Sequence, residues 1–290
     1  MKVALIGHGR WGKNIAQTLS GFPEVDLEIV ERGADASGTV DAVIIATPSA
    51  THAEIALFYI KRGVPTFIEK PLAISLADAI KIRDEAHKRK VFVFVGHLYL
   101  FNPAFKAFIN HLHEIGDIRY VSSEKTNNVT RSDVSVLWDW LPHDIAMGMK
   151  VFQSKPRCVR AWTLASDAIT KHITAAEVQF QYPDETSFVS RISSITEDKQ
   201  RRTTITGARA TIIFDDIVKH KIRLMRDGGE TILPYMPISS LTMELRVFLT
   251  SISTKKYDSE QLDLGVDVVR CIEAAHQSAS SGGKAVSIIY

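Results

Sequence analysis

Residues 5–14, "LIGHGRWGKN", place three glycines directly after an apolar strand pattern and at the start of a helical one. In a strand–turn–helix unit that binds a dinucleotide, the first glycine makes the tight turn and the second lets the backbone approach a pyrophosphate. The third lets the helix pack closely on the strand. Gly7, Gly9 and Gly12 have this spacing, and the helix that follows would offer its N-terminal amides to phosphates. The spacing alone is weak evidence, but its position after the first strand predicts a dinucleotide-binding Rossmann-type domain.

The sequence continues in the same style as far as about residue 118. Short, continuous apolar runs alternate with helical patterns, as is typical of parallel strands that are covered by helices on both faces. The predicted strands are residues 2–6, 27–31, 42–47, 66–69 and 91–95. We therefore predict an α/β dinucleotide-binding domain over residues 1–118.

The pattern changes after residue 118. Residues 178–195, "VQFQYPDETSFVSRISSI", alternate apolar and polar side chains around a Pro-Asp turn, which predicts an antiparallel hairpin. Similar alternation follows, and then two helical patterns near 239–253 and 262–279 and a terminal strand. For residues 119–290 we predict an α+β domain with a mostly antiparallel open sheet and helices on one face.

The bulk composition excludes several classes of protein. The chain has 290 residues, with 35 Lys and Arg against 33 Asp and Glu, so its net charge is +2. This balance gives no electrostatic footprint for nucleic acid or an anionic membrane. No apolar run approaches the roughly 20 residues of a membrane span, and Cys158 and Cys271 lack the spacing of a metal site or a disulfide framework. We predict a cytoplasmic protein that has no signal peptide, no metal site and no nucleic-acid partner.

The end of the second predicted strand bears on the choice of dinucleotide. Glu31 lies 24 positions after Gly7, where an acidic residue commonly holds the hydroxyls of the adenosine ribose. Arg32 beside it could instead favour a 2′-phosphate. Both side chains could equally belong to a solvated loop, so the sequence leaves NAD and NADP open.

Residues 66–73, "TFIEKPLA", end an apolar strand in a charged pair, Glu69 and Lys70. Ligands of open α/β sheets bind outside the carboxyl ends of the strands. An ammonium group there can hydrogen-bond a reacting oxygen and stabilise a developing alkoxide. The alternative, a surface Glu–Lys pair, is disfavoured because the strand is so apolar.

Residues 136–147, "VLWDWLPHDIAM", contain a second candidate pair. Asp139 and His143 are four residues apart at the start of a predicted helix, which would place them on one face. Pro142 between them is tolerated in a first turn. A carboxylate near an imidazole orients it and stabilises its protonated form, so we predict a general acid/base role for His143.

Other polar side chains near strand ends are weaker candidates. His97 follows the strand at 91–95, with Tyr99 and Asn102 nearby, and we predict that these three face a substrate. We predict the same for Trp138. His52 lies at the start of a helix near the expected cofactor, where a capping or packing role is equally consistent with the pattern.

The glycine turn, "ATPSATHAEIA" (46–56) and "EKPLA" (69–73) occur in an order that resembles the Gfo/Idh/MocA family, and the likeness extends over nearly the whole chain. The resemblance implies an NAD(P)-dependent oxidoreductase that acts on a sugar, a cyclitol or a related hydroxyl or ketone. The sequence of residues 136–147 is most similar to that of members that act on nucleotide-linked sugars. A homo-oligomer formed through the sheet of the second domain is also implied.

The same resemblance implies roles for particular residues. Lys70 would hydrogen-bond the reacting oxygen, and His143 would exchange the hydroxyl proton with Asp139 as its partner. Glu69 would face the nicotinamide ribose, and the substrate would be held between Lys70 and His143. The residues expected at the cofactor are Gly7, Gly9, Arg10, Trp11, Gly12, Glu31, Arg32, Thr47, Pro48, His52 and Glu69.

The sequence also departs from the family pattern. Residues 32–40 are too few for a crossover connection of a dozen or more residues, so we predict a Rossmann sheet that lacks about one strand–helix unit and an adenosine pocket more open on that side. Ala146 replaces an acid that is common in the family, and Asp144 would face another direction. An NAD-dependent glycosidase and a catalytically silent nucleotide-binding regulator are therefore alternatives. Lys70, Asp139 and His143 argue against the regulator, which needs none of them.

Overall fold

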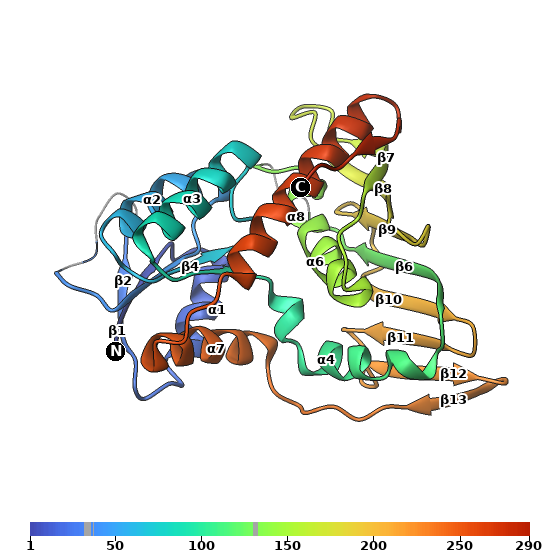
Figure 1. The fold of residues 1–290 in the computed structure, drawn as a ribbon, viewed down its shortest axis with the longest axis horizontal. Coiled ribbons are helices and arrows are strands. Elements are labelled where there is room, and N and C mark those ends of the chain that lie inside the picture. Colours follow the sequence, from blue (N-terminus) through green and yellow to red (C-terminus); the bar gives the residue numbers. More distant parts are fainter. Residues whose placement is uncertain (32–35, 37, 130–132) are drawn as a thin grey trace. The chain divides into compact units, whose positions relative to one another are not determined.

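The computed structural model describes residues 1–31, 36, 38–129 and 133–290. The chain forms two compact units, which are labelled by their elements in Figure 1. The first unit contains Met1–Leu98 and Ser239–Val269, and the second contains Tyr99–Ile238 and Arg270–Tyr290. Both units are therefore built from two separate stretches of the chain.

This division differs from the boundary that we expected at residue 118. Helix α4 (Pro103–Asn110) contacts strands β11 (Thr211–Asp215) and β12 (Ile222–Arg226) of the second unit. Helix α7 (Ser240–Thr254) belongs to the first unit, where it contacts α1 (Arg10–Leu19). The Phe248 ring of α7 also packs edge-on to Phe67, with 5.5 Å between centroids. Sequence periodicity locates a helix but does not show which sheet it covers, so this exchange of segments could not be predicted.

The first unit is built on a parallel sheet in the order β2-β1-β3-β4-β5. Its strands are β1 (Lys2–Ile6), β2 (Asp26–Val30), β3 (Ala42–Ile45), β4 (Thr66–Glu69) and β5 (Val93–Gly96). Every residue of the last three strands is buried, as expected for strands covered on both faces. Among the described residues β2 is the edge strand, which confirms the shortened Rossmann-type sheet.

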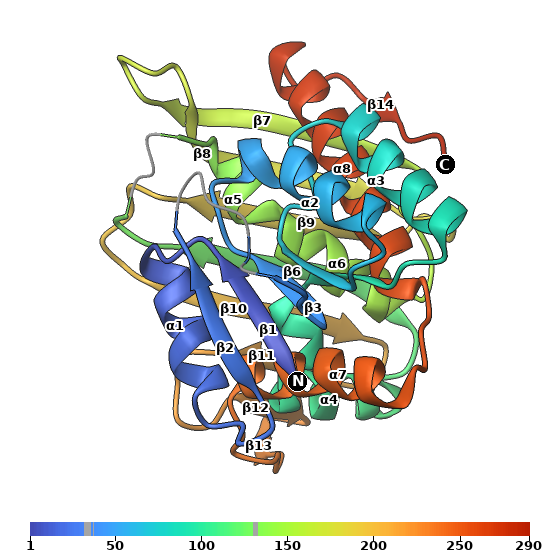
Figure 2. The same cartoon turned by 90° about the vertical axis from the view of Figure 1, so that its left-hand side faces the viewer.

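Two pairs of helices pack with this sheet (Figure 2). Helix α2 (His52–Lys61) follows a short 3₁₀ turn at Ser49–Thr51 and contacts α3 (Leu76–Arg89), while α1 contacts α7. Helix α3 begins after Ser75, whose hydroxyl caps it by accepting a hydrogen bond of 3.1 Å from the Asp78 amide.

The second unit is built on a nine-stranded sheet in the order β13-β12-β11-β10-β6-β9-β8-β7-β14. The pairings are antiparallel except for the parallel pair β6–β9, which confirms the mostly antiparallel sheet. The predicted hairpin is β8 and β9. The strands are β6 (Ile118–Thr126), β7 (Cys158–Ser166), β8 (Ile173–Gln181), β9 (Ser187–Ser193), β10 (Gln200–Gly207), β11 (Thr211–Asp215), β12 (Ile222–Arg226), β13 (Gly229–Ile232) and β14 (Val286–Ser287).

The helices of the second unit lie on one face of this sheet (Figure 1). They are α4, α5 (Val136–Asp139), α6 (Leu141–Phe152) and the last part of α8 (Glu260–Ser280), with short 3₁₀ turns at Leu98–Phe101 and Leu112–Glu114. Helix α6 approaches the sheet closely at Gly148, where an added Cβ would lie 2.5 Å from the Tyr182 hydroxyl oxygen. Ten of the twelve residues of α6 are buried, which makes it the central helix of this unit.

The single helix predicted around Asp139 and His143 is two helices in the structure. Helix α5 ends at Asp139, α6 begins at Leu141, and Trp140 between them has φ −102° and ψ −38°. Pro142 lies in the first turn of α6, as predicted. Asp139 and His143 are thus at the end of one helix and the start of the next, and the argument that they share a helix face was wrong.

Candidate active site

The glycine turn of the first unit has a different local reason for each glycine. Gly7 has φ +100°, and a Cβ added there would lie 2.7 Å from the carbonyl carbon of Ala46. A Cβ on Gly12 would lie 2.0 Å from the Gly7 carbonyl oxygen. A Cβ on Gly9 would meet no atom within 4 Å, so the backbone at Gly9 is open on that side, as approach of a pyrophosphate requires.

The N-terminus of α1 completes this turn. Helix α1 begins at Arg10 and has no acidic residue in its first turn, and no side chain caps its first amides. These amides and the positive end of the helix dipole favour an anion. The arrangement therefore fits the pyrophosphate of a dinucleotide, and Arg10 and Trp11 lie in the first turn of this helix.

His52 ties together two loops at the carboxyl edge of the sheet. Its imidazole is buried, with Nδ1 2.8 Å from the Pro71 carbonyl oxygen and Nε2 3.0 Å from the Thr47 carbonyl oxygen. The hydroxyl of Thr51 adds a 2.8 Å bond to that of Thr47. His52 thus holds the loop after β3 against the chain that leaves Lys70, which is the packing role left open by the sequence.

The tip of β4 carries a buried acid beside Lys70. The indole Nε1 of Trp11 donates a 2.7 Å hydrogen bond to Glu69 Oε1. Burial raises the pKa of Glu69 to about 7, against the opposing effects of the Trp11 hydrogen bond and the Lys70 charge. Trp11 therefore links the glycine turn directly to the end of β4.

A second buried acid, Glu244 of α7, was missed by the sequence analysis. It is fully buried, and its two carboxyl oxygens accept no hydrogen bond from the described residues. Burial, and then the charge of Glu69, raises its pKa well above the usual range. The signal was present in the sequence, because Glu244 shares a helical stripe with Leu241 and Phe248 that is otherwise apolar.

His97 follows β5 at the same edge of the sheet. It is 1% exposed, and neither ring nitrogen has a hydrogen-bond partner among the described residues. Burial, followed by the charge of Lys70, lowers its pKa to about 3, so the ring is neutral at ordinary pH. A neutral imidazole with both nitrogens unpaired is suited to hydrogen-bonding a polar ligand.

In the second unit, His143 lies close to two aromatic rings. Its ring centroid is 5.0 Å from that of Tyr99 and 6.1 Å from that of Trp140. The imidazole is buried, as the third residue of α6. Asp139 interacts electrostatically with Arg201 of β10. Proton exchange by His143 with Asp139 as its partner stays a prediction.

The remaining substrate candidates differ in how much of each side chain is available. Asn102 caps α4, since its Oδ1 accepts from the Ala104 amide at 2.9 Å, and its Nδ2 donates to Asp216 at 2.9 Å. An Asn before a Pro is a helix-start signal that we had passed over. Trp138 is half-buried beside His276, with 6.2 Å between ring centroids. Tyr99 is buried against His143 and Phe214.

The adenosine-side candidates are more exposed. Glu31 follows β2 and is exposed, Thr47 is half-buried, and Pro48 is exposed. Arg32 lies outside the described residues. In the described part of the chain there is no group of three or more His, Cys, Asp or Glu that could hold a metal ion. No helix among those residues has both the length and the apolar character needed to cross a membrane.

Sequence comparison matches part of the chain to oxidoreductases. Residues 26–97 match the family model described as "Oxidoreductase family, NAD-binding Rossmann fold". Over 149 residues, the chain is 31% identical to the UDP-N-acetylglucosamine 3-dehydrogenase of Acidithiobacillus ferrooxidans, an alignment that covers 50% of this chain and 44% of that enzyme. In sequence alignment the chain thus spans less than half the length of this curated relative.

Solved structures superpose on nearly the whole chain. A protein of Magnetospirillum magnetotacticum MS-1, described as a candidate oxidoreductase, superposes with a TM-score of 0.84 and 30% identity, over 94% of this chain and 99% of that one. The A. ferrooxidans dehydrogenase superposes with a TM-score of 0.85 and 21% identity over 97% and 98%. An inositol dehydrogenase homolog from Azotobacter vinelandii, complexed with NADH and myo-inositol, gives 0.86 and 16% over 99% and 97%. At 21% and 16% identity, the last two superpositions show only that these proteins share the fold of this chain.

Proposed function

Since the chain belongs to the Gfo/Idh/MocA family of oxidoreductases, we propose that it transfers a hydride between a nicotinamide dinucleotide and the hydroxyl-bearing carbon of a sugar. A nucleotide sugar or a related polyol is the proposed substrate class. Relatives with this fold are named for UDP-N-acetylglucosamine and for inositol, which supports that class.

The observation that carries the proposal is the convergence of polar groups in the first unit. The open backbone at Gly9, the Trp11–Glu69 hydrogen bond and the unpaired His97 ring all belong to the ends of β1, β4 and β5. The carboxyl ends of parallel strands meet at one edge of the sheet, where such folds bind dinucleotides. Lys70 follows β4 at that same edge.

A bound nicotinamide would supply the acceptor for the hydride that leaves the carbinol carbon. In the direction of oxidation, Lys70 would hydrogen-bond the substrate oxygen and stabilise the negative charge that develops on it. His143 would take the hydroxyl proton on an imidazole nitrogen, so that an alcohol becomes a ketone and one proton is released to the protein. Reduction would use the same groups in reverse.

NAD is the proposed cofactor. Glu31, the exposed acid after β2, is suited to accept hydrogen bonds from the two ribose hydroxyls, and its carboxylate would repel a 2′-phosphate.

A homo-oligomer is also proposed. Tyr120 of β6 and Trp162 of β7 are large exposed side chains on the nine-stranded sheet of the second unit. Light scattering in solution would test whether the protein forms an oligomer.

Titration of the purified protein with NAD⁺, NADH, NADP⁺ and NADPH tests the proposal first. We expect saturable binding of NAD⁺ and NADH and weaker binding of the phosphorylated pair. Failure of all four to bind would leave the nucleotide-binding role itself without support.

Turnover then separates catalysis from binding. Lys70→Ala should lower nicotinamide-dependent turnover of a UDP-sugar or an inositol by orders of magnitude and leave the circular dichroism spectrum unchanged. Lys81→Ala, which changes an exposed lysine on α3 of the same unit, is the matched control and should be neutral. Wild-type turnover in Lys70→Ala would contradict the assigned role.

A further inference from the structure

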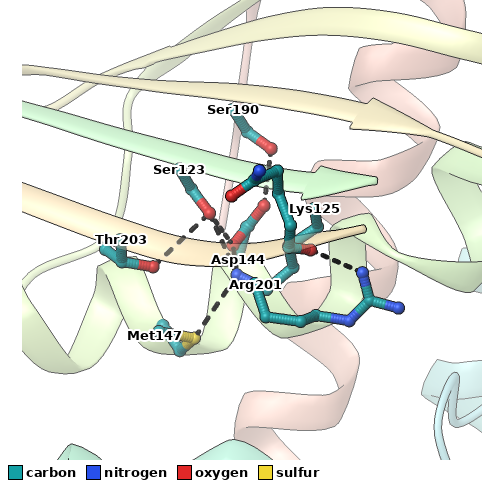
Figure 3. Close-up of polar contacts among 8 residues, drawn as sticks. Ser123, Lys125, Asp144, Met147, Ser190, Arg201 and Thr203 are labelled. Carbon is teal, nitrogen blue, oxygen red and sulfur yellow. Dashed lines mark hydrogen bonds and ion pairs between the residues drawn. The ribbon is translucent and has the colours of Figure 1, made fainter. Parts of the chain in front are cut away.

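Asp144, the residue that follows His143 in the sequence, belongs to a buried ion pair. Lys125 of β6 and Asp144 of α6 are paired through Nζ and Oδ1, and their side chains are 1% and 0% exposed. Figure 3 shows the carboxylate enclosed by side chains of the neighbouring strands. Ser123 donates to Asp144 Oδ1 at 2.8 Å and Ser190 donates to Oδ2 at 2.6 Å. Both carboxylate oxygens therefore have partners, on β6 and β9.

The polar contacts extend one step further. Lys125 Nζ also donates to the Ser123 hydroxyl at 2.9 Å, and the Thr203 hydroxyl of β10 lies 3.4 Å from that of Ser123. Strands β6 and β9 thus contact Asp144 directly, and the adjacent strand β10 is linked to it through Ser123. We call Ser123, Lys125, Asp144, Ser190 and Thr203 the Asp144 network.

Stability alone gives a poor reason for this network. Burying two charges carries a large desolvation penalty, and replacing a buried pair with apolar side chains of similar size is often neutral or stabilising. What the network does provide is a fixed position for the first turn of α6. The side chain of Trp140 does not cap that turn, and the Asp144 side chain anchors it to β6 and β9.

The same cation also reaches one of the rings beside His143. Lys125 Nζ lies 5.2 Å from the centroid of Tyr99, whose ring contacts His143. The Arg201 guanidinium lies 3.8 Å from the centroid of Trp140. Each of the two aromatic rings near the imidazole therefore has a cation close to it.

We propose that Lys125 and Asp144 are positioning residues for His143. Asp144 holds the turn that carries the imidazole, and Lys125 holds Asp144 while it packs over Tyr99. The orientation of His143 toward a substrate hydroxyl then depends on an ion pair that does not touch the substrate. This inference rests on the proposed function of His143 as the proton acceptor.

The test is the double variant Lys125→Met/Asp144→Leu, assayed with NAD⁺ and the UDP-sugar or inositol that the wild-type protein oxidises. Apolar replacements of similar size leave no unpaired charge, so we expect a folded protein. A displacement of about 1 Å at a reacting group can lower a rate by about 100-fold, and we expect kcat to fall by about 10- to 100-fold while the KM for NAD⁺ stays unchanged. The exposed pair Arg191 and Glu177 on β9 and β8 provides the control double variant, Arg191→Met/Glu177→Leu, which should keep wild-type kcat.

Isotope effects separate positioning from general damage. If the proton acceptor is misplaced, the solvent deuterium isotope effect on kcat should rise, because proton transfer becomes slower relative to hydride transfer. A folded double variant with wild-type kcat and isotope effects would overturn the inference. If the double variant does not fold, the Ser190→Ala variant provides the test. It removes one hydrogen-bond donor to Asp144 and should raise the solvent isotope effect on kcat, whereas the control Ser122→Ala on β6 should not. Equal isotope effects in the two serine variants would overturn the inference.

The proposed function fails in a different way. If His143→Ala keeps wild-type turnover, His143 is not the proton acceptor, whatever the Asp144 network does. If His143→Ala is inactive and the double variant behaves like wild type, only the positioning role is lost.

Discussion

Two buried acids of the first unit, Glu69 and Glu244, should make its stability fall as the pH rises. We consider Glu244→Gln, which replaces the fully buried carboxyl of α7 by an amide of similar size. Glu69 has its pKa raised from 4.5 to about 7, first by burial. The native unit therefore binds more protons at Glu69 than the unfolded chain does between about pH 4.5 and pH 7.

The sign and size follow from proton linkage. An acid with a raised pKa stabilises the native state less and less as the pH rises through that window. One pKa unit corresponds to about 1.4 kcal/mol, so Glu69 alone should lower the free energy of unfolding by about 3 kcal/mol between pH 4.5 and pH 8. The pKa of Glu244 is also raised, first by burial, so its effect has the same sign.

Urea unfolding between pH 5 and pH 8 measures this effect. We expect Glu244→Gln to be close to wild type at pH 5, where Glu244 is protonated in the native protein. At pH 8 it should be more stable, because the variant lacks one buried ionisable group and leaves Glu69 without a like charge nearby. Glu54→Gln, which changes an exposed acid in the first turn of α2, is the control and should follow the wild-type curve. The reasoning is refuted if wild type and Glu244→Gln lose stability equally over this range.

Three further changes test the first unit. Gly9→Ala should preserve folding, since its Cβ meets no protein atom, but should weaken NADH binding at least 10-fold in a fluorescence titration; unchanged affinity would place the pyrophosphate elsewhere. Trp11→Phe removes a hydrogen bond that lowers the pKa of Glu69, so the loss of stability with rising pH should continue to a higher pH in urea titrations, and an upper limit equal to that of the wild type would contradict this. His52→Phe removes two contacts with backbone carbonyls and should lower the free energy of unfolding by about 1–3 kcal/mol, whereas His87→Phe on the last turn of α3 should change it little.

Features that depend on neighbouring residues in the sequence could be predicted. The three glycines and the continuous apolar strands specify local geometry, so the shortened parallel sheet followed from the short stretch 32–40 before the structure was known. The start of α3 is local in the same sense, because the Ser75 hydroxyl and the Asp78 amide that form its cap are three residues apart.

Features that depend on distant contacts could not. Pro142 is compatible with the first turn of either one long helix or a second helix, so the break at Trp140 was missed. Lys125 and Glu244 are charges on otherwise buried faces, and their burial depends on strands or helices far along the chain. The role of Asn102 at a substrate stays a prediction, and in the structure its amide caps α4 and also bonds to the distant Asp216.

Transfer of deuterium tests the central claim most directly. A UDP-sugar or inositol that is deuterated at the carbinol carbon would be incubated with NAD⁺ and the protein, and the nicotinamide product analysed by mass spectrometry. We expect one deuterium in the reduced nicotinamide, with the rate lowered by orders of magnitude in Lys70→Ala and NADH binding retained. Binding of NAD⁺ without deuterium transfer from any of these substrates, or transfer at an equal rate in Lys70→Ala, would contradict the account.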